Sequence, residues 1–169
     1  MGTSNVTTKS SGIFETHAAE ETKRIAEIFV THCAPNDVVG LKGTLGAGKT
    51  CFVKGMARGL GFEADQKVTS PTFVLHKEYM GDLTLHHFDA YRLEGAQSMI
   101  ELGSDEVFAD GGISAIEWAD HVIECLPEEH FMWLFRITGC QVRELQLHVS
   151  GPALFDRFEG MQSDLQQHF

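Results

Sequence analysis

The stretch that decides the fold is Gly43-Thr44-Leu45-Gly46-Ala47-Gly48-Lys49-Thr50, which matches the pattern G-x-x-x-x-G-K-[ST] at every fixed position. Glycines let the backbone curl so that successive N–H groups point at one anion, and a helix starting near Gly48 adds the positive end of its dipole. Lys49 supplies a positive charge for the β- and γ-phosphates of a nucleotide, and the Thr50 hydroxyl is a ligand for Mg²⁺. The stretch therefore predicts a phosphate-binding loop (P-loop), with nucleotide contacts from Gly43, Gly46, Ala47, Gly48, Lys49 and Thr50.

The residues on either side of this loop support the same prediction. Residues 37–42 include Val38, Val39 and Leu41 and indicate a short strand, and a helix is expected to run from the loop to about Leu60. A chance match in a glycine-rich turn is not expected between a strand and a helix. The loop indicates nucleotide binding, but it does not identify the reaction.

The remaining pattern indicates an α/β fold. Apolar residues at helical spacing predict a helix over residues 17–33 with Thr16 as its N-cap, and an acidic helix is expected over residues 96–109. Strands are expected at residues 72–79, 83–89, 113–117, 131–138 and 142–149, the first two and the last two as hairpins. Together these elements predict a three-layer P-loop NTPase-like fold with a mixed central sheet.

The ends of the chain differ from its middle in composition. Residues 1–11 are rich in Ser, Thr, Gly and Lys, and we expect this segment to be disordered. Residues 12–150 form the expected P-loop domain. Gly151-Pro152 opens a tail over residues 151–169, whose apolar residues repeat at helical spacing, so we expect a short docked helix there.

Two acidic residues are candidates for the magnesium site that a P-loop enzyme needs. Asp89 and Glu117 each end an expected strand, and ligands bind at the carboxyl ends of strands in open α/β sheets. Usually one such carboxylate completes the metal shell, so either residue fits the position at this stage. His86 and His87 are adjacent, and neighbours on a strand face opposite sides, so they cannot both chelate one metal.

Hydroxyl side chains precede the first expected hairpin. Ser70 and Thr72 flank Pro71 between the P-loop helix and the next strand, which is where switch loops lie in nucleotide-dependent proteins. Their hydroxyls could sense the γ-phosphate or its metal, and a plain proline-containing turn explains the same residues equally well. Elsewhere an Asn-Lys-x-Asp element for guanine is absent from the sequence, which favours ATP.

Composition narrows the classes of protein. The chain has 169 residues, 43% of them hydrophobic, and a formal net charge of −11. Nucleic-acid binders usually present a basic face, so we expect no direct tight binding of RNA or DNA by this chain alone. The apolar stretches are too short to span a bilayer and the start lacks a signal-peptide pattern, so we expect no membrane association and a cytoplasmic protein. The spacing of the four cysteines matches neither a disulfide scaffold nor a zinc site.

Four motifs in a fixed order make the sequence similar to a known family. They are Gly46-Ala47-Gly48-Lys49-Thr50, Ser70-Pro71-Thr72-Phe73, His87-Phe88-Asp89-Ala90-Tyr91-Arg92-Leu93 and Ile116-Glu117-Trp118. Over residues 14–149 the chain closely resembles the bacterial TsaE family. These are small P-loop ATPases required to form threonylcarbamoyladenosine (t6A) at position 37 of tRNA.

The resemblance implies a reaction and partners. The protein would bind and hydrolyse ATP while docked on TsaD and TsaB, and TsaD would transfer the threonylcarbamoyl group to tRNA. Thr50 and Glu117 would hold Mg²⁺, and Asp89 would be a second acid needed for hydrolysis beside Lys49. Ser70 and Thr72 would form the switch loop, with Trp118 beside the site. Further nucleotide contacts are assigned by position to Cys51, Thr22 and Arg143; Cys51 replaces the hydroxyl residue common after the P-loop threonine.

Two other classes of protein share the loop. A small-molecule kinase would need a lid with several basic residues, and no such cluster follows the loop among the 13 Lys and Arg residues. A nucleotide-gated binding module without meaningful hydrolysis is compatible with the same residues. An arginine finger is not evident, because a structural salt bridge is the simpler role for Arg92, so we expect slow intrinsic hydrolysis.

Overall fold

The computed structural model describes residues 7–62 and 67–169. Within these residues, one seven-stranded sheet runs in the order β1-β7-β6-β2-β5-β4-β3. Its strands are β1 (Thr8–Thr16), β2 (Val38–Lys42), β3 (His76–Met80), β4 (Thr84–Asp89), β5 (Ile113–Glu117), β6 (His130–Ile137) and β7 (Arg143–Ser150). The four central strands β6, β2, β5 and β4 are parallel, whereas β7, β1 and β3 add to the edges antiparallel. The predicted mixed sheet is therefore confirmed.

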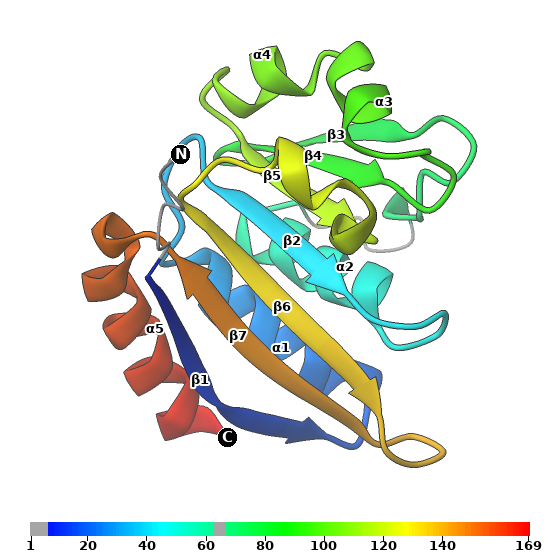
Figure 1. Ribbon diagram of the computed structural model, residues 1–169. Helices are drawn as coiled ribbons and strands as arrows, with labels where there is room; N and C mark the ends of the chain where they lie inside the picture. Colours follow the sequence, from blue (N-terminus) through cyan, green and yellow to red (C-terminus); the bar gives the residue numbers. More distant parts are fainter. Residues whose placement is uncertain (1–6, 63–66) are drawn as a thin grey trace.

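Helices cover both faces of this sheet (Figure 1). One layer contains α1 (Ala19–Val30), α2 (Lys49–Gly59) and α5 (Phe155–His168), and the other contains α3 (Ala96–Glu101), α4 (Ser104–Phe108) and the 3-10 helix η2 (Ala119–Cys125). A short 3-10 turn, η3 (Pro152–Leu154), leads into α5. The three-layer α/β architecture predicted from the sequence is confirmed. None of the helices in the described part of the chain is both long and apolar enough to cross a bilayer.

Two hydrophobic cores lie on opposite faces of the sheet because successive strand residues point to opposite sides. In β2, Val39 packs in the core beneath α1 and α2, while its neighbour Val38 packs beneath η2. The larger core is built around Phe29, Phe52 and Trp133, whose rings meet at centroid distances of 5.0 to 5.9 Å. This packing fixes α2, and α2 begins at the lysine of the P-loop motif.

The amino-terminal expectation is wrong for the residues that the structure describes. Residues 8–11 belong to β1, which pairs antiparallel with β7 from Thr8 opposite Ser150 to Thr16 opposite Arg143. The partner strand supplies the backbone hydrogen bonds that this polar segment cannot obtain locally. Residues 1–6 of the predicted disordered segment lie outside the described residues.

The carboxy-terminal helix is confirmed. Helix α5 has 14 residues and buries Phe158, Met161 and Leu165 in the larger core beside α1. Arg157 reinforces the attachment through an ion pair of 2.6 Å with Asp37 at the start of β2. The tail therefore shares a core with the residues before it.

Three local predictions need correction. The helix expected over residues 96–109 is split into α3 and α4, because Gly103 adopts a left-handed φ of 79° between them. The strand expected from residue 72 begins at His76, since residues 71–75 form a turn closed by a hydrogen bond of 2.6 Å from the Leu75 N–H to the Pro71 carbonyl. Thr16 does not cap α1, whose N-cap is Ala18.

Candidate active site

The Gly43–Thr50 loop joins the end of β2 to the start of α2, as predicted. Gly46 and Gly48 take left-handed φ values of 77° and 107°, a conformation that favours glycine. Gly48 is the N-cap of α2, and no described side chain caps the helix there. The first N–H groups of α2 therefore face the loop together with the positive end of the helix dipole, which is the arrangement that binds an anion.

Lys49 folds back over this loop. Its Nζ donates to the Gly43 and Thr44 carbonyls at 2.5 and 3.0 Å and lies 3.9 Å from the centre of the Trp118 ring. Burial lowers the pKa of Lys49, and the nearby Glu117 carboxylate partly opposes this effect. A desolvated cation held by two carbonyls and an aromatic ring can exchange these partners for an anion.

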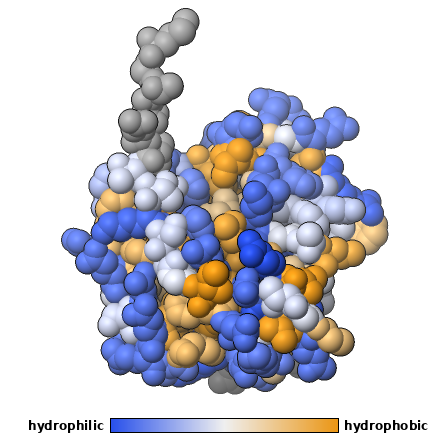
Figure 2. All heavy atoms as spheres, turned by 60° about the horizontal axis from the view of Figure 1, so that its bottom comes forward, coloured by the Kyte–Doolittle hydropathy of each residue, from blue (hydrophilic) through white to orange (hydrophobic). Residues whose placement is uncertain are grey.

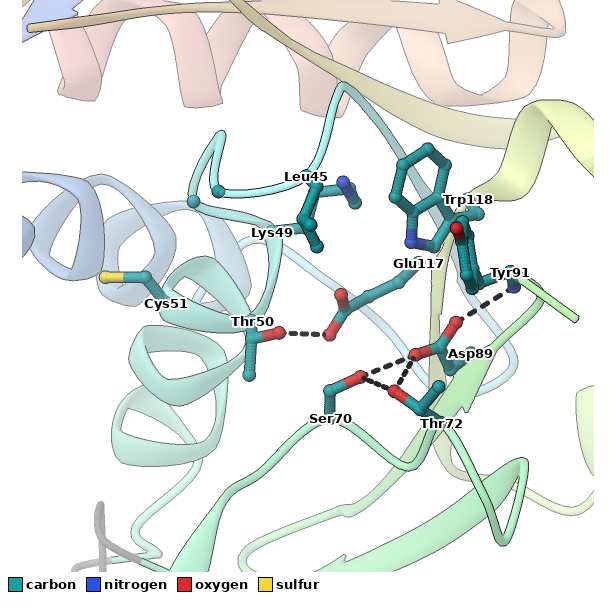
Figure 3. Close-up of a pocket in the computed structure, with 12 residues that line it drawn as sticks. Leu45, Lys49, Thr50, Cys51, Ser70, Thr72, Asp89, Tyr91, Glu117 and Trp118 are labelled. Carbon is teal, nitrogen blue, oxygen red and sulfur yellow. Dashed lines mark hydrogen bonds between the residues drawn. The ribbon is translucent and has the colours of Figure 1, made fainter. Parts of the chain in front are cut away.

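Glu117 ends β5 and is almost completely buried. Its Oε1 accepts a hydrogen bond of 2.7 Å from the Thr50 hydroxyl (Figure 3). The same oxygen lies 2.8 Å from Nε2 of His87 on β4. The parallel pairing of β4 with β5 sets Asp89 directly opposite Glu117, so both carboxylates reach the same edge of the sheet. Both acids are thus at strand carboxyl ends, as predicted.

Asp89 is held by the segment predicted as a switch loop. Its Oδ2 accepts hydrogen bonds of 2.5 and 2.9 Å from the hydroxyls of Ser70 and Thr72, and its Oδ1 accepts one of 2.9 Å from the backbone N–H of Tyr91. The two hydroxyls are 3.1 Å apart (Figure 3). A plain turn would not require this convergence, so the loop is tied to the buried acid.

Trp118 and Tyr91 form one wall of the site. Trp118 has a left-handed φ of 59°, which is strained for a bulky residue and turns the chain sharply after Glu117. Its ring lies 4.9 Å from that of Tyr91. This turn places the indole ring of Trp118 against the Lys49 ammonium group. Trp118 lies beside the site as the sequence predicted, whereas Tyr91 was not selected among the candidates.

These groups enclose a cavity of about 360 Å³. It is lined by Leu45, Gly46, Gly48, Lys49, Thr50, Cys51, Ser70, Thr72, Asp89, Tyr91, Glu117 and Trp118. Two carboxylates and the hydroxyls of Thr50, Ser70 and Thr72 lie beside one lysine there, and such oxygen atoms are the hard ligands that Mg²⁺ prefers. The donor set fits a magnesium ion, and the loop, with its lysine, fits the phosphates.

A second cavity of about 430 Å³ adjoins the first and shares Gly46, Gly48 and Cys51 with it. It is lined in addition by Thr16, Ala18, Ala19, Thr22, Cys140, Gln141 and Arg143. The structure therefore brings Thr22 and Arg143 together, and Arg143 donates to the Gly46 carbonyl at 3.2 Å. Cys51 points away from the acids, and its Sγ lies 3.3 Å from the Ala19 carbonyl.

Other sequence candidates fall outside these cavities. Arg92 lies over the Phe73 ring at 4.3 Å, so a cation–π contact takes the place of the expected salt bridge. Gly43 and Ala47 belong to the loop without lining either cavity. The missed contributors Gln141 and Cys140 come from the turn between β6 and β7, and no motif marks that turn in the sequence.

Comparisons with known proteins agree on one family. The profile of the family described as "Threonylcarbamoyl adenosine biosynthesis protein TsaE" matches residues 16–145. A protein of Bacillus subtilis named tRNA threonylcarbamoyladenosine biosynthesis protein TsaE is 41% identical over 150 residues, which cover 88% of this chain and 90% of the relative. A protein of the same name from Treponema pallidum is 42% identical over 128 residues, covering 76% and 93% of the two chains. The crystal structure of Bacillus subtilis YdiB aligns with a TM-score of 0.74 and 36% identity, covering 96% of this chain and 97% of that one.

Proposed function

The chain belongs to the TsaE family, and from this membership we propose that it is an ATP-binding, slowly ATP-hydrolysing accessory protein for t6A formation at position 37 of tRNA, acting on a TsaD–TsaB complex. The observation that carries the proposal is the pairing of the Gly43–Thr50 loop with two buried carboxylates. The Thr50 hydroxyl lies 2.7 Å from Glu117, and Asp89 is opposite Glu117 in the sheet register.

The nucleotide contacts divide between the two cavities. The N–H groups around Gly46 to Thr50 and the Lys49 ammonium hold the phosphates. The neighbouring cavity lined by Thr22 and Arg143 takes the adenosine, because it adjoins the loop and is open to the surface through exposed residues such as Ala19. Thr50 and Glu117 hold Mg²⁺, which neutralises charge on the β- and γ-phosphates when bound.

Asp89 takes the part of the second acid. Water attacks the γ-phosphorus, the bond from that phosphorus to the β–γ bridging oxygen breaks, and ADP and inorganic phosphate result. Asp89 orients the attacking water, while Ser70 and Thr72 fix the rotamer of its carboxylate through their hydrogen bonds. Because these hydroxyls lie on a loop, a change in the loop's position alters the aim of Asp89.

Slow turnover of the isolated chain follows from the charges around the first cavity. Among the described residues that line it, Lys49 is the basic side chain and no arginine is present. P-loop proteins that lack an arginine at the γ-phosphate hydrolyse slowly until a partner supplies or orders one. Partner binding is therefore expected to raise the rate.

The surface around the first cavity suits a protein partner. Leu45, Phe73, Val74 and Tyr91 are all more than half exposed, and they come from the P-loop, the switch loop and the end of β4. Strand β6 runs toward the lower end of the molecule in Figure 1. Figure 2 views the molecule with this end turned forward, and hydrophobic side chains lie between hydrophilic ones on the face shown. Exposed apolar side chains grouped on one side of a protein mark interaction surfaces.

Reconstituted tRNA modification tests this proposal. TsaD and TsaB from the same organism, a threonylcarbamoyl donor, substrate tRNA and ATP would be combined with and without this chain, and t6A per TsaD would be counted over time. We expect repeated turnover only when the chain and ATP are both present. Equal turnover without the chain would contradict the proposed role. As a control, the variant Asp156→Asn, changed on the exposed surface of α5, should support the same turnover as the unmodified chain.

A further inference from the structure

Three potential metal ligands meet on the face of the sheet opposite the nucleotide site. His76 and Glu78 lie two residues apart on β3 and therefore point to the same side, and His86 on β4 stands directly opposite Glu78 in the antiparallel register. The neighbouring His87 faces the other side, where it meets Glu117. The two adjacent histidines thus serve different faces.

The ligand atoms of these three residues all lie within 4.8 Å of one another. Nε2 of His76 is 3.1 Å from Nδ1 of His86, and that same Nδ1 is 3.6 Å from Oε1 of Glu78. Tetrahedral Zn²⁺ with bonds of about 2.0–2.2 Å separates its ligand atoms by about 3.3–3.6 Å. Two of the three separations, 3.1 and 3.6 Å, are therefore close to the edges of a zinc tetrahedron, and the third is within 4.8 Å.

The far side of the His86 ring has the partner that a metal-binding histidine usually has. Its Nε2 lies 2.8 Å from Oδ2 of Asp110, in the turn before β5. Asp110 is itself fixed, because its Oδ1 accepts a hydrogen bond of 2.9 Å from the Gly112 N–H, and this bond is the main cause of its lowered pKa. Although this contact does not meet the geometry of a hydrogen bond, a carboxylate beside the second ring nitrogen favours the tautomer in which Nδ1 is free to bind a metal.

The surroundings of the three side chains suit a site with three protein ligands and one open coordination position. His86 is buried, and the His76 ring is stacked on Phe88 at 4.2 Å and 6°, so both imidazoles are held before any ion arrives. Glu78 is exposed and can complete the site from the solvent side. Two imidazoles and a carboxylate suit Zn²⁺ better than Mg²⁺ or Ca²⁺, which prefer oxygen ligands.

We propose that His76, Glu78 and His86 form a zinc-binding site that links the edge strand β3 to β4. The site is distinct from the proposed magnesium site, which lies on the opposite face. The proposed zinc site is also close to the switch loop. His76 directly follows Leu75, and the Leu75 carbonyl accepts a hydrogen bond of 3.1 Å from the Asp89 N–H. Zinc would stabilise the strand that follows the Ser70–Thr72 segment.

The competing explanation is a hydrogen bond between the two histidines, which the 3.1 Å distance also allows. A measurement of zinc binding distinguishes this hydrogen bond from a metal site. The full-length chain, freed of metal with a chelator and kept in excess Mg²⁺ with a non-thiol reductant, would be titrated with Zn²⁺ against a chromophoric indicator. We expect one tight site per chain, and Co²⁺ in the same site should give the visible absorption of nitrogen and oxygen coordination.

Two variants assign the site. His76→Phe keeps a ring to stack on Phe88, and Glu78→Gln changes one exposed carboxylate, so circular dichroism should show that both fold. Each is expected to lower Zn²⁺ affinity at least about tenfold. His17→Asn is the matched control, because His17 lies 3.0 Å from Glu15 in an exposed pair that belongs to no three-ligand group among the described residues. Absence of a tight site in the unmodified chain, or its survival in both variants, would overturn the proposal.

Discussion

The Thr50 hydroxyl donates a hydrogen bond of 2.7 Å to Oε1 of Glu117, joining the last residue of the P-loop motif to the last residue of β5. These residues are 67 positions apart in the chain, and the parallel pairing of β2 with β5 brings them together. The same carboxylate oxygen lies 2.8 Å from His87, so side chains from α2, β4 and β5 meet at the proposed magnesium site.

Glu117→Gln is expected to lower Mg²⁺-dependent ATP hydrolysis at least about 100-fold, or about 2.7 kcal/mol. The amide keeps the shape of the side chain and its hydrogen bond with Thr50, but it loses the charge that binds Mg²⁺. Hydrolysis over a range of Mg²⁺ concentrations would be compared with that of the exposed Glu124→Gln variant. Full activity at ordinary Mg²⁺ would show that Glu117 is not a metal ligand.

Asp89→Asn is expected to separate binding from chemistry. The amide cannot orient water as a carboxylate does, so hydrolysis should fall about 100-fold. The affinity for Mg²⁺–ATP should change little, because Asp89 is held by Ser70, Thr72 and Tyr91 rather than by the P-loop. Calorimetric titration and phosphate release give the two quantities, and an equal loss of affinity would instead make Asp89 a metal ligand.

Ala19→Trp is expected to block the second cavity. Ala19 is exposed at the start of α1 and lines that cavity, so an indole there fills space without disturbing the core. ATP affinity should fall about 30-fold, or about 2 kcal/mol, while the affinity for tripolyphosphate should remain. Ala109→Trp, at an exposed position after α4, is the control. Unchanged ATP affinity in Ala19→Trp would place the adenosine elsewhere.

Acid should destabilise the folded chain through two histidines near each other on β6 and β7. Burial lowers the pKa of His130, opposed by its hydrogen bonds with backbone carbonyls, and burial also lowers the pKa of His148. The unfolded chain therefore binds more protons between these lowered values and about 6.5, so the free energy of unfolding falls as the pH drops below neutrality. Urea titrations from pH 7.5 to 5 would measure the fall, and His130→Gln should reduce it more than His17→Gln does.

The parts of the site that could be predicted from the sequence are those set by local pattern. The P-loop needs glycines, lysine and threonine at fixed spacing, and Asp89 and Glu117 each follow a short apolar run that ends in an acid. The convergence of Ser70 and Thr72 on Asp89 depends on contacts 19 and 17 positions apart, and the sequence placed these hydroxyls in a switch loop without indicating that contact.

Features that depend on contacts between residues far apart in the chain could not be predicted from local sequence patterns. The strand β1 is polar and became a strand because β7, about 140 residues later, supplies its hydrogen bonds. The cavity beside Arg143 joins the P-loop to residues of β1, α1 and the β6–β7 turn. Thr22 and Arg143 were assigned to the nucleotide by position, but no motif marks the other residues that these elements contribute. The pairing of His86 with His76 and Glu78 follows from the β3–β4 register, which a hairpin prediction does not fix to the residue.

The most direct test of the central claim is ATP hydrolysis by the purified chain, alone and with TsaD and TsaB from the same organism, beside the Lys49→Ala variant. We predict slow phosphate release by the chain alone, a marked increase with the two partners, and loss of both activities in the variant. Fast hydrolysis by the chain alone, or no response to TsaD and TsaB, would contradict the account and favour a free-standing kinase or ATPase.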